Sequence, residues 1–493
     1  MNRRVVSVLV VAGLVGGGVV AADLVPAPQR TQGLAAAGAV LPVSSATLVC
    51  PSVGADRRTG VTTVAVASAP APPSRSAGSV TAQPLPTTGQ APHRLVQAAG
   101  VGAVVDLSDA HNRSAVVLAS GGPAATLGAV QTTRTASGPG RGLSTARCVA
   151  PARDWWFAGP TGWLGTYGQV MLTNVESTVA LVDIGLWGHD GQLNVPAAQG
   201  ITVPPGSRVV VPLSQLIPDQ ANALLHVVAI TGRVAAAVSD VRHSGSGPDG
   251  IDWVPATTAP DRDVVVPGLS AAAPIRKLVV GVPGADDATI SVRVVGTSGS
   301  FVPTSLARLT VPGGTVRTID LSKVLAAEDV AVEVKSDAPV VVAGLLYGRD
   351  ASTGFGDVAW TAGVAALDGA GVVAETRVHR GNDTQIILSA PDGPATVVVS
   401  ALAPSPPHQV TVQIAAGRTV TVDVASVLPA NASSGAVAVE PQLGSGRVYA
   451  GRLVYEHGAH GPLFTMLPIW SGPSTADVPP VIADIGAPYE SSR

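Results

Sequence analysis

The segment GTVRTIDLS (Gly314–Ser322) combines a glycine turn, an alternating strand and a short Leu-Ser exit. The same pattern recurs at steps of roughly 100 residues, which is the length of one β-sandwich. Its other copies are GVGAVVDLS (Gly100–Ser108), GSRVVVPLS (Gly206–Ser214) and GRTVTVDVA (Gly417–Ala425). The repetition predicts an all-β protein built from tandem antiparallel β-sandwich-like modules.

Alternation of polar and apolar residues supports this prediction outside the repeated segments. Thr, Ser and Arg alternate with Ile and Val over residues 289–294, as in a half-buried strand. Two further alternating runs, 410–414 and 420–424, flank the small residues 415–417 and predict a β-hairpin. Long helical periodicity is absent after the N-terminal segment.

The spacing of the repeats sets the expected domain boundaries, because a chain of 493 residues exceeds what one core usually supports. Module 1 has the weakest alternation and contains a Pro-rich stretch at 70–92, which we interpret as a loop. We expect a signal peptide or signal anchor at 1–22, a flexible linker at 23–43, module 1 at 44–150, module 2 at 151–262, module 3 at 263–368, module 4 at 369–475 and a C-terminal tail at 476–493.

The charge of the chain argues against a nucleic-acid partner. Charged residues make up 13% of the sequence, and 30 basic residues against 33 acidic ones give a formal net charge of −3. No Lys/Arg cluster occurs outside the extreme N-terminus, so the electrostatic footprint of a nucleic-acid-binding protein is missing.

The N-terminus has the pattern of an export signal. Asn2-Arg3-Arg4 precedes the apolar run Val5–Ala22, and the first acidic residue, Asp23, follows directly. The small residues of Val20–Ala22 suit cleavage, whereas eighteen apolar residues would span about 27 Å of helix and suit retention as an anchor. Both alternatives place the N-terminus in the cytoplasm and residues 23–493 outside it.

The two cysteines are compatible with an oxidising compartment. Cys50 lies at the first strand expected in module 1, and Cys148 lies just after the last. We predict that they form a disulfide, which would tie the ends of the module with the weakest strand pattern. Two unpaired buried thiols are the alternative.

Aromatic residues recur near the joints between modules. Asp154-Trp155-Trp156, Asp252-Trp253, the Asp357–Trp360 segment and Trp470 are spaced by about one module. The first interpretation is packing between neighbouring modules. The alternative is an exposed ligand platform that stacks against sugar rings, formed by Trp155, Trp156, Phe157, Trp163 and Tyr167.

Enzymatic motifs are scarce. The sequence lacks a Gly-x-Ser-x-Gly elbow, a P-loop and a His-Glu-x-x-His helix. A glycosidase needs two facing carboxylates, and the candidates are turn residues: Asp240, Asp249, Asp252, Asp286 and Asp287. We therefore predict no catalytic residues and no enzymatic activity.

Metal and cofactor sites are not expected either. His457 and His460 form a His-x-x-His pair beside Glu456, but two glycines in the same stretch favour a polar loop end. An aspartate recurs at one repeat position, in Asp106, Asp320 and Asp423, but module 2 has Pro212 there. A shared calcium or catalytic role would not tolerate proline, so capping is the better interpretation.

Four features of the chain resemble the actinobacterial domain-of-unknown-function 5719 family. They are the N-terminal signal-anchor, the Asp-Trp-Trp-Phe-Ala-Gly stretch at 154–159, the turns at 203–206 and 311–314, and the Ser-Asp-Ala-Pro-Val-Val-Val-Ala-Gly run at 336–344. The likeness covers residues 150–470. It implies an exported or membrane-tethered protein of the actinobacterial cell envelope, and it carries no activity or catalytic residues to transfer.

Export, repetition and the missing motifs together suggest a non-enzymatic, extracytoplasmic scaffold or interaction module. Its expected partner is a cell-wall polymer or an envelope protein, with the membrane as a further contact if the N-terminal segment stays uncleaved. The alternatives are a carbohydrate-binding accessory protein for cell-wall polysaccharide and a diverged hydrolase.

Overall fold

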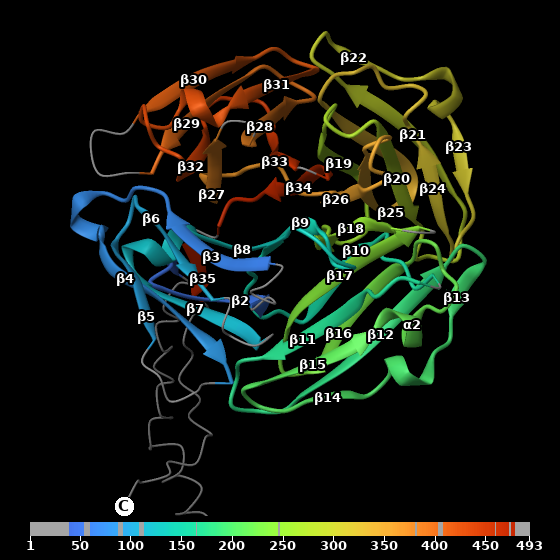
Figure 1. The fold of residues 1–493 in the computed structure, drawn as a ribbon, viewed down its shortest axis with the longest axis horizontal. Helices are drawn as coiled ribbons and strands as arrows, with labels where there is room; N and C mark the ends of the chain where they lie inside the picture. Colours follow the sequence, from blue (N-terminus) through green and yellow to red (C-terminus); the bar gives the residue numbers. More distant parts are fainter. Residues whose placement is uncertain are drawn as a thin grey trace, which may run out of the picture. The chain divides into compact units, whose positions relative to one another are not determined.

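Antiparallel β-strands dominate the computed structural model, which confirms the predicted fold class (Figure 1). The structure describes residues 39–53, 60–86, 92–107, 113–163, 165–244, 247–379, 382–402, 408–458, 460–472 and 475–478. The predicted signal or anchor at 1–22 lies outside these residues. Within them, no helix has the length and apolar character that a membrane crossing requires.

The chain forms two compact units, and the larger spans Val43–Ser474. The described part of the smaller unit is one antiparallel pair, β1 (Ala39–Pro42) with β35 (Thr475–Val478). In its register Ala39 is opposite Val478. Residues from near the two ends of the chain are thus joined by backbone pairing.

Module 1 of the larger unit consists of β2 (Ser45–Val53), β3 (Gly60–Ser68), β4 (Ala77–Leu85), β5 (His93–Ala98), β6 (Gly102–Asp106), β7 (Arg113–Gly121), β8 (Leu127–Thr135) and β9 (Gly142–Arg147). They pair in two antiparallel sheets, in the orders β2-β7-β4-β5 and β6-β3-β8-β9. The loop expected at 70–92 is wrong over Ala77–Leu85, because this stretch buries Val80 and Ala82 and pairs with β7 and β5. The apolar core between these sheets includes both cysteines.

Module 2 repeats this plan with β10 (Asp154–Ala158), β11 (Gln169–Asn174), β12 (Ala180–Gly188), β13 (Gly191–Leu193), β14 (Ile201–Val203), β15 (Ser207–Pro212), β16 (Leu224–Thr231), β17 (Ala235–Ser244) and β18 (Gly247–Val254). Its sheet orders are β10-β16-β12-β13 and β15-β11-β17-β18. A short helix, α2 (Leu213–Leu216), follows β15.

Module 3 consists of β19 (Asp261–Leu269), β20 (Ile275–Gly281), β21 (Ala288–Val295), β22 (Ser300–Phe301), β23 (Leu309–Val311), β24 (Val316–Asp320), β25 (Val330–Arg349) and β26 (Gly356–Ala362). The long β25 joins two sheets, because its first half pairs with β21 and its second half with β20 and β26.

Module 4 consists of β27 (Gly371–His379), β28 (Asn382–Ala390), β29 (Ala395–Ala401), β30 (Gln409–Ile414), β31 (Arg418–Asp423), β32 (Ser434–Pro441), β33 (Tyr449–Gly458) and β34 (Gly461–Ile469). Its two strand orders are β30-β29-β32-β27 and β31-β28-β33-β34, and β28 also pairs with the end of β27. The hairpin predicted from residues 410–414 and 420–424 is wrong, because β30 pairs with β29 whereas β31 pairs with β28. Short 3-10 turns complete the unit: η1 (Pro73–Arg75), η3 (Gly122–Thr126), η4 (Pro196–Ala198), η5 (Thr304–Leu306) and η6 (Val424–Ser426).

The repeated sequence segment forms the same strand in every module, namely β6, β15, β24 and β31. The glycine that opens each copy has a positive φ, between 59° and 89°, which residues with a side chain rarely adopt. The apolar residue at each exit is buried in its module core: Leu107, Leu213, Leu321 and Val424. The turn and the exit residue therefore fix the two ends of this edge strand.

The four modules close into a cycle within the larger unit. The last strand of each module contacts the last strand of the next, in the order β9, β18, β26 and β34, and β34 returns to β9. These four labels lie together at the inner side of the modules in Figure 1. The cycle gives every module two neighbours.

The predicted disulfide is confirmed. Cys50 and Cys148 are bonded across a sequence separation of 98 residues, and both side chains are buried. Cys50 lies on β2, whereas Cys148 directly follows β9. The bond thus joins the first and last strands of module 1, and it indicates an oxidising, extracytoplasmic environment.

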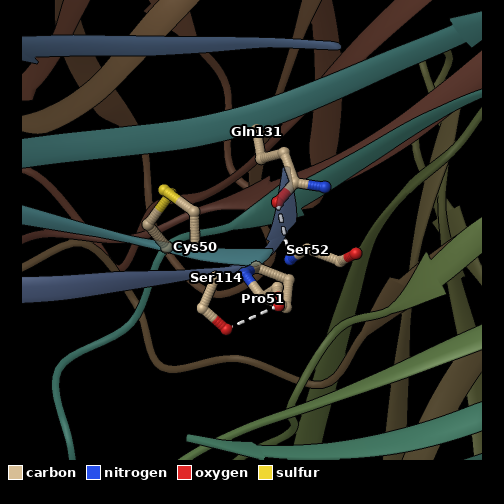
Figure 2. The surroundings of a disulfide bond; sticks show 6 residues. Cys50, Pro51, Ser52, Ser114 and Gln131 are labelled. Carbon is tan, nitrogen blue, oxygen red and sulfur yellow. Dashed lines mark hydrogen bonds between the residues drawn. A yellow bond between two sulfur atoms is a disulfide. The ribbon is translucent and has the colours of Figure 1, made fainter. Parts of the chain in front are cut away.

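Residues beside the disulfide also connect module 1 to module 2. Figure 2 shows the Ser114 hydroxyl donating to the Pro51 carbonyl at 2.8 Å, and the Ser52 N–H donating to Gln131 Oε1 at 3.0 Å. Arg208, on β15 of module 2, donates to the same Pro51 carbonyl at 3.0 Å. The disulfide therefore lies next to a joint between modules.

Candidate ligand-binding groove and the hub behind it

A buried aspartate on β18 joins four modules. Asp252 Oδ1 accepts the Thr145 N–H of β9 and the Thr465 hydroxyl of β34, each at 3.1 Å. Its Oδ2 accepts the Trp360 N–H of β26 at 3.0 Å. One carboxylate of module 2 is thereby bonded to modules 1, 3 and 4.

A second buried aspartate, on β26, has a similar role. Asp357 Oδ2 accepts the Leu143 N–H at 3.0 Å and the Phe464 N–H at 2.9 Å, from modules 1 and 4. Arg141 approaches from module 1 and donates to the Gly461 carbonyl at 2.8 Å. We call Asp252, Asp357 and the groups that bond to them the hub.

Glycines allow the central strands to approach one another closely. A Cβ at Gly250 would lie 2.4 Å from Asp357 Oδ1, and a Cβ at Gly142 would lie 2.6 Å from a side-chain carbon of Ile251. Gly250 also has a φ of 114°. A residue with a side chain at either position would separate the strands that carry the hub.

The electrostatics of the hub follow from its burial. Loss of solvent raises the pKa of Asp252 and of Asp357 well above the ordinary value, and the hydrogen bonds from backbone N–H groups oppose this rise. The hub is inaccessible to solvent, so its carboxylates fix the arrangement of strands rather than meet a ligand.

An open groove with a volume of about 840 Å³ lies where module 1 meets module 4. This volume is within the range typical of small-molecule sites. The lining residues come from β6, β8, β27, β32, β33 and the ends of neighbouring strands, and they are Gly102, Ala103, Val104, Arg134, Ala374, Glu375, Thr376, Arg377, Leu402, Ser433, Ser434, Gly435, Ala436, Glu456 and His457.

The charged residues of the groove form one ion-paired chain. Arg377 donates to Glu375 Oε1 at 2.8 Å and to Glu456 Oε1 at 3.2 Å. Arg134 Nε donates to Glu456 Oε2 at 2.6 Å, and the Thr132 hydroxyl donates to Glu375 Oε2. Every carboxylate oxygen in the groove therefore already accepts a hydrogen bond.

Burial alone would lower the pKa of Arg377, but the charges and hydrogen bonds of Glu375 and Glu456 outweigh it, and the net shift is upward. The two carboxylates thus hold this guanidinium in its charged form. Arg134 differs from Arg377 in being 40% exposed along its side chain. Of the two arginines in this ion-paired chain, Arg134 is the more exposed to solvent.

A buried arginine connects the groove to the hub. Arg452 donates to the Glu375 carbonyl at 3.1 Å and to Thr145 Oγ1 at 2.9 Å, and the N–H of Thr145 bonds to Asp252. Burial lowers the pKa of Arg452 to about 10. The groove wall is therefore fixed from behind by polar contacts that continue into the centre of the unit.

The sequence did not reveal the groove, because its parts come from distant segments. Arg134 is separated from Glu456 by 322 residues. The local signal is the Glu375-Thr376-Arg377 triplet, in which period-two spacing places opposite charges on one strand face.

The predicted aromatic platform divides between the core and the surface. Trp156 and Phe157 are buried in the core of module 2, and Trp156 stacks on His226 with ring centroids 3.7 Å apart. Trp155 packs partly buried against the same core and donates its Nε1–H to the Val234 carbonyl at 3.1 Å. Burial within β10 therefore removes Trp156 and Phe157 from any surface platform.

The other two aromatic residues of that group are exposed. Trp163 is 55% exposed and Tyr167 is 66% exposed. The Thr166 N–H and hydroxyl both donate to the Trp163 carbonyl, and the Tyr167 ring meets His243 edge to face at 5.5 Å. The backbone at Thr166, between the two rings, is thus held by hydrogen bonds to Trp163.

Most carboxylates considered for a glycosidase have structural partners. Asp240 Oδ2 accepts from Arg242 at 2.7 Å and from the Trp360 indole at 3.0 Å. Asp249 accepts the Tyr347 hydroxyl at 2.7 Å, and Asp252 belongs to the hub. The remaining two candidates, Asp286 and Asp287, lie in one exposed loop. There Asp287 accepts the Gly313 N–H at 3.0 Å.

The two histidines of the His-x-x-His pair contact aromatic rings. His457 meets Tyr455 at 4.8 Å between ring centroids, and His460 meets Phe355 at 6.1 Å. Among the residues that the structure describes, no three or more His, Cys, Asp or Glu side chains are grouped to hold a metal ion.

The aspartates at the repeated strand exit act as caps in two modules. Asp320 Oδ1 accepts the Ser322 N–H, and Asp423 Oδ1 accepts the Ala425 N–H, each at 2.9 Å. Both bonds confirm the expected turn chemistry at those positions.

Comparison with known proteins places the chain in a family without an assigned activity. No curated protein matches the chain. A family model, described as a family of unknown function, matches residues 103–425, which extends into module 1 beyond the likeness seen in the sequence. The matched region includes residues 103–106 of β6 and both aspartates of the hub. Because this match covers more than half of the chain, the protein belongs to the domain-of-unknown-function 5719 family.

Proposed function

We propose that the protein is a non-enzymatic, extracytoplasmic binding scaffold that presents the groove between modules 1 and 4 to a partner in the cell envelope. The observation that carries this proposal is the state of the groove carboxylates. All four oxygens of Glu375 and Glu456 already accept hydrogen bonds from Arg377, Arg134 and Thr132. A carboxylate used as general acid or base must reach the substrate instead.

The hub supports the proposed scaffold role because its contacts fix the wall of the groove. Asp252 and Asp357 bond to the strands of neighbouring modules, and Arg452 extends these contacts to the groove wall. Binding to a preorganised surface loses less conformational entropy than binding to a mobile one. A groove held in this way suits a protein whose role is to bind.

The test is retention of envelope components on the immobilised full-length protein. Wild type is compared with Arg134→Ala and with Asp286→Ala, an exposed carboxylate outside the groove, as a control for altered charge. We expect the Arg134→Ala variant alone to lose a retained component. Equal retention by all three proteins would reject the groove, and release of soluble sugar or peptide from purified wall by wild type would reject the non-enzymatic role.

A second candidate function, binding of cell-wall polysaccharide, is favoured by the exposure of Trp163 and Tyr167. Two exposed aromatic rings on a hydrogen-bonded turn offer flat apolar faces with a polar edge. Here we expect saturable retention on intact wall but not on polysaccharide-stripped wall, lost in Trp163→Ala and kept in Arg134→Ala. Retention unaffected by Trp163→Ala would remove this candidate.

A further inference from the structure

Trp470, one of the aromatic residues near the joints between modules, stacks on a cation. The guanidinium carbon of Arg147 lies 4.4 Å from the centroid of the Trp470 ring. Arg147 ends β9 of module 1, whereas Trp470 directly follows β34 of module 4. A ring that covers one face of a guanidinium leaves the N–H groups at its edges available for an acceptor. The pair thus joins two modules and still offers donors.

The guanidinium of Arg147 lacks an anionic partner within the part of the chain that the structure describes. There its contact with Trp470 is the one interaction that its side chain makes. Burial lowers the pKa of Arg147 to about 10, and no carboxylate among the described residues opposes this shift. Arg377 shows the contrast, because its two glutamates outweigh burial and raise its pKa. A half-buried charge without a counter-ion is unfavourable, so Arg147 gains from any anion that reaches it.

A cavity of about 40 Å³ lies beside this guanidinium, between modules 1 and 4. It has room for a few water molecules or for one small anionic group. Of the described residues that line it, two are arginines, Arg147 and Arg452, and none is Asp or Glu. Thr126, Trp470 and Gly472 in its lining are half-buried, which places the cavity near the surface.

The second arginine of the lining also has a donor in excess. Arg452 is buried, and its two terminal nitrogens donate to the Glu375 carbonyl and to Thr145 Oγ1. Its Nε–H is buried as well and meets no hydrogen-bond acceptor among the described residues. A buried donor without an acceptor is unfavourable. Two cationic side chains with unused donors therefore border one cavity.

A second space, of about 60 Å³, also borders Arg147 and Trp470, on the side of module 2. Among the described residues of its lining, Arg147 is the one charged side chain, and its neighbours there include Trp155, Phe157 and Trp253. One cation among apolar rings offers fewer donors than two arginines do. The cavity between modules 1 and 4 is therefore the better anion site.

The charges and walls of that cavity select the class of anion. Glu375 and Asp252 oppose the fall in the pKa of Arg452, whereas Arg147 has no such neighbour in the described chain. One positive charge is thus left without compensation, which suits a monovalent anion better than a phosphate. A carboxylate carries a single charge and matches the edge of a guanidinium with two parallel hydrogen bonds. A short hydrocarbon part would meet the apolar residues of the lining, which include Leu127, Val372 and Ile469.

We propose that the cavity between modules 1 and 4 binds a carboxylate group, held by the Arg147 guanidinium on the Trp470 ring, with Arg452 as a second cation. The carboxylate belongs either to a small free acid or to the end of a longer chain. The site differs from the groove, and this proposal does not depend on the proposed function. Because residues of both modules line the cavity, a bound carboxylate also stabilises their contact.

The test is calorimetric titration of the full-length protein at constant ionic strength and near-neutral pH. The probes are sodium acetate, sodium chloride, sodium phosphate, and acetylated dialanine with either a free or an amidated C-terminus. Arg147→Met removes the charge and keeps an unbranched side chain, and Arg147→Lys keeps the charge without the planar fork. Arg262→Met is the matched control, because Arg262 is an exposed arginine of module 3.

We expect wild type to bind acetate and Arg147→Met to bind it about tenfold or more weakly. Arg147→Lys should recover part of the affinity, and Arg262→Met should bind as wild type does. The Tm of wild type should rise more with acetate than with chloride at the same ionic strength, and this difference should vanish in Arg147→Met. If Arg147→Met does not fold, wild type and Arg147→Lys still decide the result.

The outcomes identify the source of the carboxylate or remove the site. Binding of dialanine with a free C-terminus but not of its amide would support the end of a chain, and binding of acetate alone would support a small acid. Affinity for chloride or phosphate equal to that for acetate would overturn the carboxylate assignment. The site itself would be rejected if no probe bound, or if acetate bound Arg147→Met as tightly as wild type.

Discussion

The hub and the groove each contain two buried carboxylates, but the two regions neutralise them differently. Asp252 and Asp357 bond to backbone N–H groups of neighbouring modules, and Glu375 and Glu456 bond to guanidinium groups. Backbone donors cannot move without moving a strand, whereas arginine side chains can rotate away. The comparison teaches that the hub fixes architecture, while the groove keeps charge that can reorganise around a ligand.

Removal of a hub carboxylate should have the largest effect on stability. Asp252→Leu leaves three donors, from Thr145, Trp360 and Thr465, without their acceptor. Each buried unpaired donor costs about 1–3 kcal/mol, so we expect a loss of roughly 3–9 kcal/mol before any gain from removing a buried charge. Denaturant unfolding measures the loss. Asp286→Leu, on the surface, should change little, and equal effects of the two variants would refute the role of the hub.

Loss of the disulfide should have the second-largest effect on stability. This variant tests whether module 1, which forms one wall of the groove, opens separately from the other modules. In the chain-entropy model, a loop of 98 residues contributes about 4–5 kcal/mol. We expect the double variant Cys50→Ala/Cys148→Ala to unfold at a lower denaturant concentration. Hydrogen exchange should rise in β2–β9 more than in β19–β26. Uniform exchange across both modules would mean that the hub couples them too tightly for separate opening.

The pH dependence should separate the two regions. Burial raises the pKa of Asp252 and Asp357 in the folded protein, so the folded state binds more protons than the unfolded chain between the ordinary and the raised pKa. The free energy of unfolding should therefore fall as pH rises through that window, and mild acidification should stabilise the protein. Thermal unfolding of wild type and Asp357→Asn at several pH values measures this. A steeper slope in the variant would contradict the assignment.

The groove should tolerate substitution best. Arg134 is part-exposed, and Glu456 keeps its contact with Arg377 when Arg134 is replaced. We expect Arg134→Gln to cost about 1–3 kcal/mol, because Glu456 is buried but keeps the charge of Arg377 beside it. The same unfolding assay provides the number. A loss as large as that of Asp252→Leu would show that the groove is part of the architecture and not a separable surface.

The strand pattern of this fold was readable because it is local. The glycine turn and the apolar exit, as in Gly314 and Leu321, recur in each copy and occupy the same edge strand in the structure. The pairing of Cys50 with Cys148 was also readable, since the two cysteines flank one module. The strand periodicity and the positions of the two cysteines can each be recognised within a single repeat.

The closed cycle and the groove could not be predicted from the sequence, because they depend on contacts between repeats. The sequence marks Asp252 and Asp357 as neighbours of tryptophan, and Asp252 also as a turn carboxylate, but nothing near them indicates Thr145 or Phe464 as partners. The structure divides the predicted aromatic platform between core and surface for a related reason. Strand alternation and the turn after it decide that Trp156 is buried and Trp163 exposed, although composition treats them alike.

The pairing of β1 with β35 has a mechanical consequence. Chain ends pulled in opposite directions would first load the outermost pair, Ala39 with Val478, and then each following pair in turn up to Pro42 with Thr475. Such a pair opens one step at a time at low force, like a zipper. Tension that reaches the protein through its two ends is thus met by four residue pairs before it acts on the strand at Ser45 or the one that ends at Ile469.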